Sequence, residues 1–105
     1  MAQFDVYRNP SARQREDMPY MVNVQSDLLD GLPTRLIMPL AVPSLVPSSI
    51  PLNLCPRVDF DGQRFHALAQ LAAPFRVRDL GKPVGSVPGS ASDIVAALDA
   101  VVSGV

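Results

Sequence analysis

The sequence predicts a small, mostly β fold, in which an antiparallel sheet closes into a partly open barrel or is covered by one C-terminal helix. Eleven prolines among 105 residues exclude long helices and central strands from much of the chain. Apolar alternation flanks Asp61-Gly62, the strongest local hairpin signal in the chain. Helical spacing of apolar residues appears only after Ala91. The length suits one domain over residues 1–105.

The first half of the chain predicts three strands separated by polar or turn-rich segments. Gln3–Tyr7 alternates in polarity and is the first predicted strand. The polar, aperiodic Asn9–Asp17 predicts an exposed loop, and Met18–Gln25 predicts the second strand. Ser26–Pro33 carries Asp-Gly and predicts a turn. Thr34–Leu40 is almost continuously apolar, which predicts a third strand in a central position.

The middle of the chain predicts turns followed by a hairpin. Ala41–Pro56 holds four prolines, so no long regular element is expected there and a single helical turn is the most it accommodates. Arg57–Phe60 and Gln63–Leu68 flank Asp61-Gly62 and predict two paired strands.

The last third predicts one more strand and the helix. Phe75–Val77 is a short strand, and Leu80–Pro88 is a connection rich in Gly and Pro. Ser90 stands three residues before Asp93, a spacing that predicts a capping box at the start of the helix. Gly104 is placed to end it. The apolar residues at helical spacing are Ile94, Val95, Leu98, Val101, Val102 and Val105.

Charge and cysteine content narrow the classes of function. Nine Lys and Arg oppose ten Asp and Glu, a net charge of −1, which argues against direct nucleic-acid binding. The lone Cys55 excludes an internal disulfide and fits a reducing compartment. The start of the chain lacks the pattern of a signal peptide, and no apolar run approaches the ~20 residues of a membrane span. We therefore expect a cytoplasmic protein that does not contact membranes.

The residues able to do chemistry are isolated in the sequence. His66 has no second histidine or cysteine nearby, which predicts an ordinary strand histidine. Cys55 precedes a proline in an apolar stretch and is predicted to be buried and inert. No metal-ligand spacing is present. The sequence thus predicts no catalytic residue, no metal and no cofactor.

Four segments resemble one protein family. Gln3-Phe4-Asp5-Val6-Tyr7 is similar to the opening Gln-Phe-x-Val-Tyr of CcdB-type toxins. The segment 22–30 (Val-Asn-Val-Gln-Ser-Asp-Leu-Leu-Asp) resembles their Val-x-Val-Gln-Ser-Asp followed by two aliphatic residues and Asp. Pro39-Leu40-Ala41 matches a Pro-Leu-Ala in the family, and the segment from Asp93 to Val105 resembles their terminal helix. The likeness spans essentially the whole chain.

The resemblance implies a fold, an activity and partners. CcdB-type toxins form homodimers with an SH3-like barrel core and a C-terminal helix. They bind the A subunit of DNA gyrase and trap its cleaved-DNA complex, so they poison an enzyme rather than catalyse a reaction. A cognate antitoxin neutralises them through a disordered segment that folds on the toxin. The polar loop at Asn9–Asp17 is a candidate antitoxin contact, although its composition fits a merely flexible loop equally well.

The resemblance also implies which residues bind gyrase and which form the dimer. Ser103 stands where the family has a tryptophan thought to stack on a gyrase arginine, and Val102 stands at an aromatic position. Tryptophan anchors at interfaces are worth ~2 kcal/mol or more. Val101 and Val105 are expected in the dimer interface. The expected gyrase contacts are Leu28, Leu29, Asp99, Val102, Ser103, Gly104 and Val105.

Two alternatives remain open at this point. A diverged homologue that folds and dimerises but no longer poisons gyrase fits the serine at position 103. An endoribonuclease is the less favoured alternative, since RNA-cleaving toxins share the barrel fold. RNA cleavage needs an acid–base pair with a stabilising arginine, and Arg35 and His66 are the available residues, with no local motif grouping them.

Overall fold

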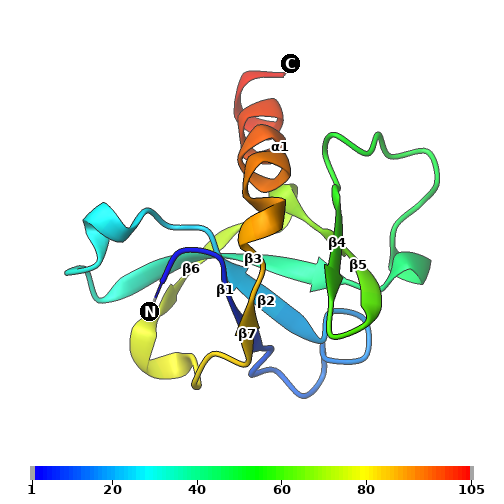
Figure 1. The fold of residues 1–105 in the computed structure, drawn as a ribbon. Helices are drawn as coiled ribbons and strands as arrows, with labels where there is room; N and C mark the ends of the chain where they lie inside the picture. Colours follow the sequence, from blue (N-terminus) through cyan, green and yellow to red (C-terminus); the bar gives the residue numbers. More distant parts are fainter. Residues whose placement is uncertain (1, 105) are drawn as a thin grey trace.

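The computed structural model describes residues 2–104 and confirms a mostly β protein with one C-terminal helix (Figure 1). An antiparallel sheet curls into a half-barrel in the order β4-β5-β3-β2-β1-β7, and β6 also pairs with β3. The strands are β1 (Asp5–Arg8), β2 (Tyr20–Asn23), β3 (Thr34–Ala41), β4 (Arg57–Phe60), β5 (Gln63–Ala67), β6 (Ala73–Arg76) and β7 (Gly85–Ser86).

Strand β3 is central, as its apolar run predicted. One of its edges pairs with β2, from Ile37 to Leu40. Its other edge is shared, because β6 pairs with the segment from Thr34 to Ile37 and β5 pairs with Leu40 and Ala41. The strand is therefore covered by partners on both sides, which explains its near-continuous hydrophobicity.

Pro39 lies inside β3 without interrupting a ladder, whereas the sequence predicted that the strand would end close to it. The Leu68 N–H donates to the Pro39 carbonyl at 2.9 Å, so the backbone groups of Pro39 face away from β2. They point to the junction where pairing with β6 stops and pairing with β5 starts. Because no ladder bond is needed there, the missing N–H of proline is tolerated.

The hairpin predicted around Asp61-Gly62 is confirmed. Strands β4 and β5 pair with Phe60 opposite Gln63, leaving a two-residue loop. Both loop residues have positive φ, 53° at Asp61 and 75° at Gly62, as a type I′ turn requires. The residue chemistry of the loop thus sets the register of the hairpin.

Helix α1 (Ala91–Ser103) ends as predicted but begins differently. Gly104 adopts φ 78° and its N–H donates to the Ala100 carbonyl, which closes the helix. The predicted capping box is wrong, because the Ser90 side chain makes no capping hydrogen bond. A 3-10 turn that starts at Pro88 runs directly into the helix, so Ser90 has φ −97° and ψ 4° instead of the extended backbone of a cap.

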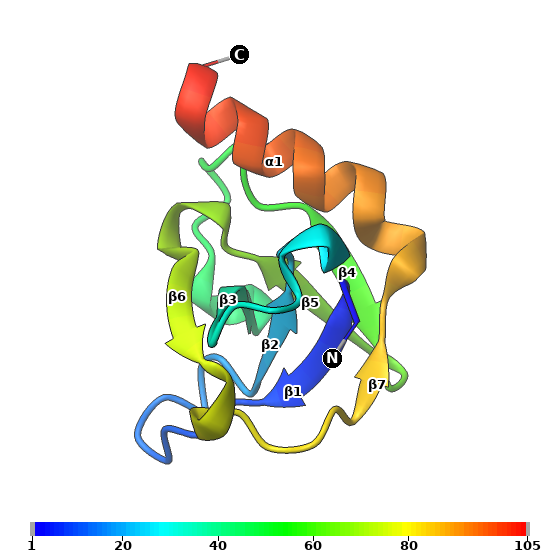
Figure 2. The same cartoon turned by 90° about the vertical axis from the view of Figure 1, so that its left-hand side faces the viewer.

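The helix lies across one end of the half-barrel (Figure 2) and packs on it through a face partly made of alanine. Ile94, Ala97 and Ala100 are buried, whereas Val95 and Val101 are exposed. The predicted apolar stripe is therefore only partly the packed face. Small side chains let the helix approach the sheet closely, and valines remain on the outside. The core under the helix contains Val6, Val22, Met38, Leu40, Val58, Phe65 and Ile94.

Several short elements escaped the sequence patterns. The predicted connection Leu80–Pro88 contains β7, which pairs with β1. None of the helices within residues 2–104 has the length and apolar character needed to cross a membrane. Within residues 2–104, four 3-10 turns lie between strands and a fifth, η5 (Pro88–Ser90), leads from β7 into α1. The four are η1 (Asp27–Leu29), η2 (Pro43–Leu45), η3 (Ala69–Leu71) and η4 (Val77–Asp79).

Candidate functional site

Turn η1 exposes two large apolar side chains. Leu28 is 95% exposed and Leu29 is 50% exposed. The turn forms because Ser26 accepts hydrogen bonds from the next residues, its Oγ from the Leu28 N–H at 3.2 Å and its carbonyl from the Leu29 N–H at 3.0 Å. The Asp30 N–H also donates to the Asp27 carbonyl. Tight local bonding therefore bends the backbone so that the leucines point away from the core.

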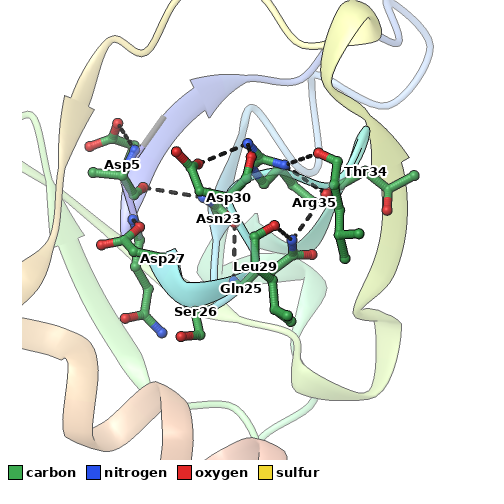
Figure 3. Close-up of polar contacts among 12 residues, drawn as sticks. Asp5, Asn23, Gln25, Ser26, Asp27, Leu29, Asp30, Thr34 and Arg35 are labelled. Carbon is green, nitrogen blue, oxygen red and sulfur yellow. Dashed lines mark hydrogen bonds and ion pairs between the residues drawn. The ribbon is translucent and has the colours of Figure 1, made fainter.

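Beneath this turn lies the guanidinium of Arg35, which is only 5% exposed (Figure 3). Its Nη1 donates to the carbonyls of Leu32 at 2.6 Å and Thr34 at 2.9 Å. Its Nη2 donates to both the carbonyl and the carboxylate of Asp30, each at 2.9 Å. A buried charge is costly unless it is paired, and these four bonds satisfy it. Arg35 thereby ties the segment from Asp30 to Thr34 to β3.

Gln25 holds the same segment from the other side. Its Nε2 donates to the carbonyls of Leu29 at 3.2 Å and Thr34 at 3.1 Å, and its Oε1 accepts from the Leu36 N–H at 3.0 Å. Buried Asn23 accepts from the Gln25 N–H. Figure 3 shows these side chains converging under the turn. The polar residues of the segment 22–30 therefore build the loop that carries the leucines.

The start of the chain supplies a further contact with η1. The Gln3 N–H donates to Asp27 Oδ1 at 2.8 Å, and Gln3 Nε2 donates to the Val24 carbonyl at 3.1 Å. Phe4 adopts φ 69°, unusual for a bulky residue, and its N–H donates to the Asn23 carbonyl at 2.6 Å. This turn brings the N-terminal segment against the loop that precedes η1.

The last turn of α1 is the second exposed apolar region. Val102 is 86% exposed and Val101 is 42% exposed. The Ser103 hydroxyl donates to the Asp99 carbonyl at 2.6 Å, one turn back along the helix. Asp99 and Gly104 are also exposed, and Val105 lies outside the described residues. The helix backbone and this one side-chain bond therefore order this end of the helix.

The structure brings the predicted contact residues into two groups. Leu28 and Leu29 lie together on η1, and the residues from Asp99 to Gly104 share the last turn of α1. Figures 1 and 2 show η1 at the side of the half-barrel and the end of α1 projecting above it. Within one chain the two groups lie apart.

An open groove of about 570 Å³ was not anticipated by the sequence analysis. The Phe60 ring covers Gly85, where an added Cβ would lie 2.5 Å from the ring, so the unpaired strands β4 and β7 meet through this contact. Arg8 pairs with Tyr20 in the β1–β2 ladder, which places both beside the groove. The groove is lined by Arg8, Arg15, Pro19, Tyr20, Phe60, Asp61 and Val84.

The groove carries net positive charge, because two arginines, Arg8 and Arg15, line it beside one carboxylate, Asp61. Arg15 donates to the carbonyls of Asn9 at 2.6 Å and Pro10 at 3.4 Å, so the backbone of the 9–17 loop holds its side chain in place. Buried Asn9 in turn donates to the Met18 carbonyl. Within residues 2–104 neither Arg8 nor Arg15 forms an ion pair. The groove thus offers positive charge beside aromatic surface.

The candidate catalytic groups are not assembled into one site. His66 Nδ1 lies 2.9 Å from the Cys55 carbonyl, which requires the proton on Nδ1. His66 pairs with Ala41 at the far end of β3 from Arg35, six residues or about 20 Å of strand away. Among residues 2–104 no group of three metal-binding side chains occurs. His66 lies in strand β5, as predicted.

Two buried groups have shifted pKa values. Burial raises the pKa of the Cys55 thiol, and a weak hydrogen bond to Gln70 opposes it. Cys55 is buried, as predicted, and a raised pKa favours its protonated thiol. Burial, followed by the negative charge of Asp5, raises the pKa of the Tyr7 hydroxyl. Neither shift creates a nucleophile.

Large apolar side chains held out on a fixed loop suit recognition of another macromolecule better than chemistry on a small substrate. The geometry is therefore that of a small half-barrel protein with two exposed apolar groups, on η1 and at the end of α1. A family model described as CcdB protein matches residues 3–104. The chain belongs to the CcdB family. No curated protein matches the chain at a significant level.

Sequence reasoning missed the residues that build and flank these surfaces. Arg35, Gln25 and Asn23 were visible as polar residues beside apolar strands, which is a signal for buried polar networks. Arg8 and Arg15 are distant in sequence from Phe60, so only the folded sheet reveals the groove.

Proposed function

We propose that this protein is the cytoplasmic toxin of a type II toxin–antitoxin system. It binds the A subunit of DNA gyrase, traps the cleaved-DNA complex and catalyses no reaction itself. Membership of the CcdB family over residues 3–104 is the observation that carries this proposal. The exposed leucines of η1 and the exposed end of α1 support it, since both stand at positions implied to contact gyrase.

We propose that the gyrase contacts comprise both exposed groups. Leu28 provides the largest apolar surface, and Val102 provides the next largest. Ser103 replaces a family tryptophan, so the protein relies more on η1 than an aromatic-bearing relative does. The proposed contacts are Leu28, Leu29, Asp99, Val102, Ser103, Gly104 and Val105, the last outside the described residues.

A homodimer is part of the proposal. Val101 is about half exposed on the outer side of α1, so it has surface left for a partner protomer. In a two-fold dimer both protomers use the same surface patch, so each contact occurs twice and a modest patch is buried on both protomers. Val105 is proposed for the same interface and lies outside the described residues.

We assign the groove at Arg8 and Arg15 to the antitoxin. Two guanidinium groups that form no ion pair within residues 2–104 outnumber the one carboxylate of the groove, Asp61, and so attract acidic side chains. The neighbouring Tyr20 and Phe60 rings provide apolar contact. Arg8→Glu is expected to weaken binding of the antitoxin by about tenfold, through lost attraction and added repulsion. Arg64→Glu, on exposed β5 outside the groove, is the matched control for charge.

The central experiment measures gyrase poisoning directly. Purified protein is incubated with gyrase and supercoiled plasmid, and linear DNA is scored after denaturation of the complex. Cleaved DNA together with capture of the gyrase A subunit supports the proposal, and absence of both overturns it. Leu28→Ala is expected to reduce cleavage, whereas Leu52→Ala, also highly exposed but on the proline-rich segment, leaves it unchanged.

A second candidate function is a folded homologue that no longer poisons gyrase. The observation that favours it is the pair Val102 and Ser103, which stand at two aromatic positions of the family. Cells expressing the protein alone would then survive, as would cells expressing a form truncated after Val102. Toxicity of the full chain that is lost on truncation rules this candidate out.

The endoribonuclease alternative is tested separately. Single-stranded RNA is incubated with the protein and with His66→Ala. Cleavage that disappears in the variant would establish it, although the separation of Arg35 and His66 along β3 speaks against a shared site.

A further inference from the structure

The loop that carries Leu28 and Leu29 is exposed at its tip and tightly bonded at its base. Turn η1 has no buried residue of its own. Apolar packing therefore cannot be what holds it. Its order instead comes from hydrogen bonds of polar side chains (Figure 3). Arg35 of β3 and Gln25 donate to backbone carbonyls of the loop, and Asp27 accepts from the backbone N–H of Gln3 in the N-terminal segment.

Arg35 is the principal of these side chains. One buried guanidinium satisfies the carbonyls of Asp30, Leu32 and Thr34 and pairs with the Asp30 carboxylate. The three carbonyls span the segment that leads from η1 into β3, so a single planar group fixes the exit of the loop. Lysine has neither the five donors nor the fork geometry needed to reproduce this.

Asp27 fixes the entry of the loop. Its Oδ1 accepts the Gln3 N–H at 2.8 Å, and its carbonyl accepts the Asp30 N–H at 3.1 Å. The two exposed leucines lie between these attachment points, one at Asp27 and one at Asp30.

We propose that Arg35 and Asp27 are positioning residues that pre-order the leucine-bearing loop for its protein partner without touching that partner. The inference rests on the proposed function for the identity of the partner, the gyrase A subunit. A loop that is already ordered loses less conformational entropy on binding, so the leucines contribute more of their burial to affinity. An unpinned loop would bury the same leucines and bind more weakly.

Amide hydrogen exchange tests the ordering itself. The N–H groups of Leu28, Leu29, Asp30 and Leu32 are all hydrogen-bonded within the loop. Arg35→Gln is expected to speed their exchange by tenfold or more, while the amides of β2 and α1 keep their rates. Equal acceleration everywhere would mean global destabilisation and overturn a positioning role. Unprotected loop amides in the wild type would overturn it as well.

Asp27 offers a matched pair of variants at an exposed position, where failure to fold is not at issue. Asp27→Asn keeps an oxygen to accept the Gln3 N–H, and Asp27→Ala removes it. Asp27→Ala is expected to weaken capture of the gyrase A subunit several-fold, with Asp27→Asn close to wild type. If Asp27→Asn is as weak as Asp27→Ala, the carboxylate itself contacts the partner and the positioning role of Asp27 is refuted.

A double-mutant cycle with Leu28→Ala then connects Arg35 to the leucines. Arg35→Gln is expected to weaken binding of the gyrase A subunit about tenfold in the wild type and much less in Leu28→Ala, because the positioned group is already gone. The same loss in both backgrounds would refute the positioning role. If the wild type does not bind gyrase A, the proposed function fails, while the exchange rates still decide whether Arg35 orders the loop.

Discussion

The η1 loop and the last turn of α1 both expose apolar side chains, but different interactions hold them. The loop depends on Arg35, Gln25 and Asp27, whose side-chain hydrogen bonds include contacts between residues that are 5 to 24 positions apart in the sequence. The end of α1 depends on its own backbone and on one Ser103 hydroxyl bond. Exposed apolar surface in this chain is thus ordered by side-chain hydrogen bonds at one place and mainly by local helix geometry at the other.

The largest expected effect on stability comes from removing a side chain under the loop. Gln25→Ala leaves the Leu36 N–H without its partner. It also removes one of the two hydrogen bonds to the Leu29 carbonyl and one of the two to the Thr34 carbonyl, which keep Leu32 N–H and Arg35 as donors. We expect the free energy of unfolding to fall by about 1–3 kcal/mol, measured by urea denaturation. Gln14→Ala, at an exposed turn, is the control. An unchanged urea midpoint for Gln25→Ala would contradict the conclusion that side-chain hydrogen bonds hold the η1 loop.

Restoring an aromatic residue tests the end of α1. Ser103→Trp is expected to strengthen binding of the gyrase A subunit by tenfold or more, about 1.4 kcal/mol, because tryptophan anchors dominate interfaces of this kind. Its stability should stay close to wild type, since the position is exposed. Ser92→Trp, at the exposed first turn of the same helix, should not change affinity. Equal gains in affinity at both positions would indicate non-specific hydrophobic binding by the added tryptophan.

Replacing the glycine that ends α1 is expected to lower the stability of the protein. Gly104 has φ 78° and open space around the position of an added Cβ, so Gly104→Ala introduces backbone strain without a clash. We expect a loss of about 1 kcal/mol in the free energy of unfolding, read from thermal denaturation. Gly89→Ala also has open space but no left-handed φ, and should be neutral. A neutral Gly104→Ala would show that the last turn is frayed.

The smallest effect is predicted for the hydroxyl at the end of α1. Ser103→Ala removes a bond to the Asp99 carbonyl, an exposed group that water can satisfy instead. The change in unfolding free energy should lie within about 0.5 kcal/mol, and the helical circular dichroism should be unaltered. A loss comparable to that of Gln25→Ala would mean that this helix end is held by side chains after all.

Apolar periodicity and turn residues were sufficient to predict the elements of the fold that depend on short-range interactions. Asp61-Gly62 dictates a tight hairpin through its tolerance of positive φ, and Gly104 dictates the end of α1 for the same reason. The apolar run in β3 correctly indicated a strand with neighbours on both edges. The capping box at Ser90 failed because Pro88 starts a 3-10 turn first, a competition between neighbours that spacing alone does not reveal.

Spacing also misplaced the packed face of α1. Val95, Val101 and Ala97 all fit helical periodicity, yet Ala97 is buried against the half-barrel and the two valines are exposed. How closely a helix lies on a sheet decides which side chains fit between them, and that distance is a property of the assembled layers.

Local preferences therefore account for the strands, the hairpin, the helix and its end, since each depends on residues a few positions apart. The site depends on the fold. Gln3 reaches Asp27, and Arg8 and Arg15 border Phe60, only once the sheet has assembled. Buried polar groups must find partners wherever the chain places them, so their pairing is set by the tertiary structure and not by spacing in the sequence.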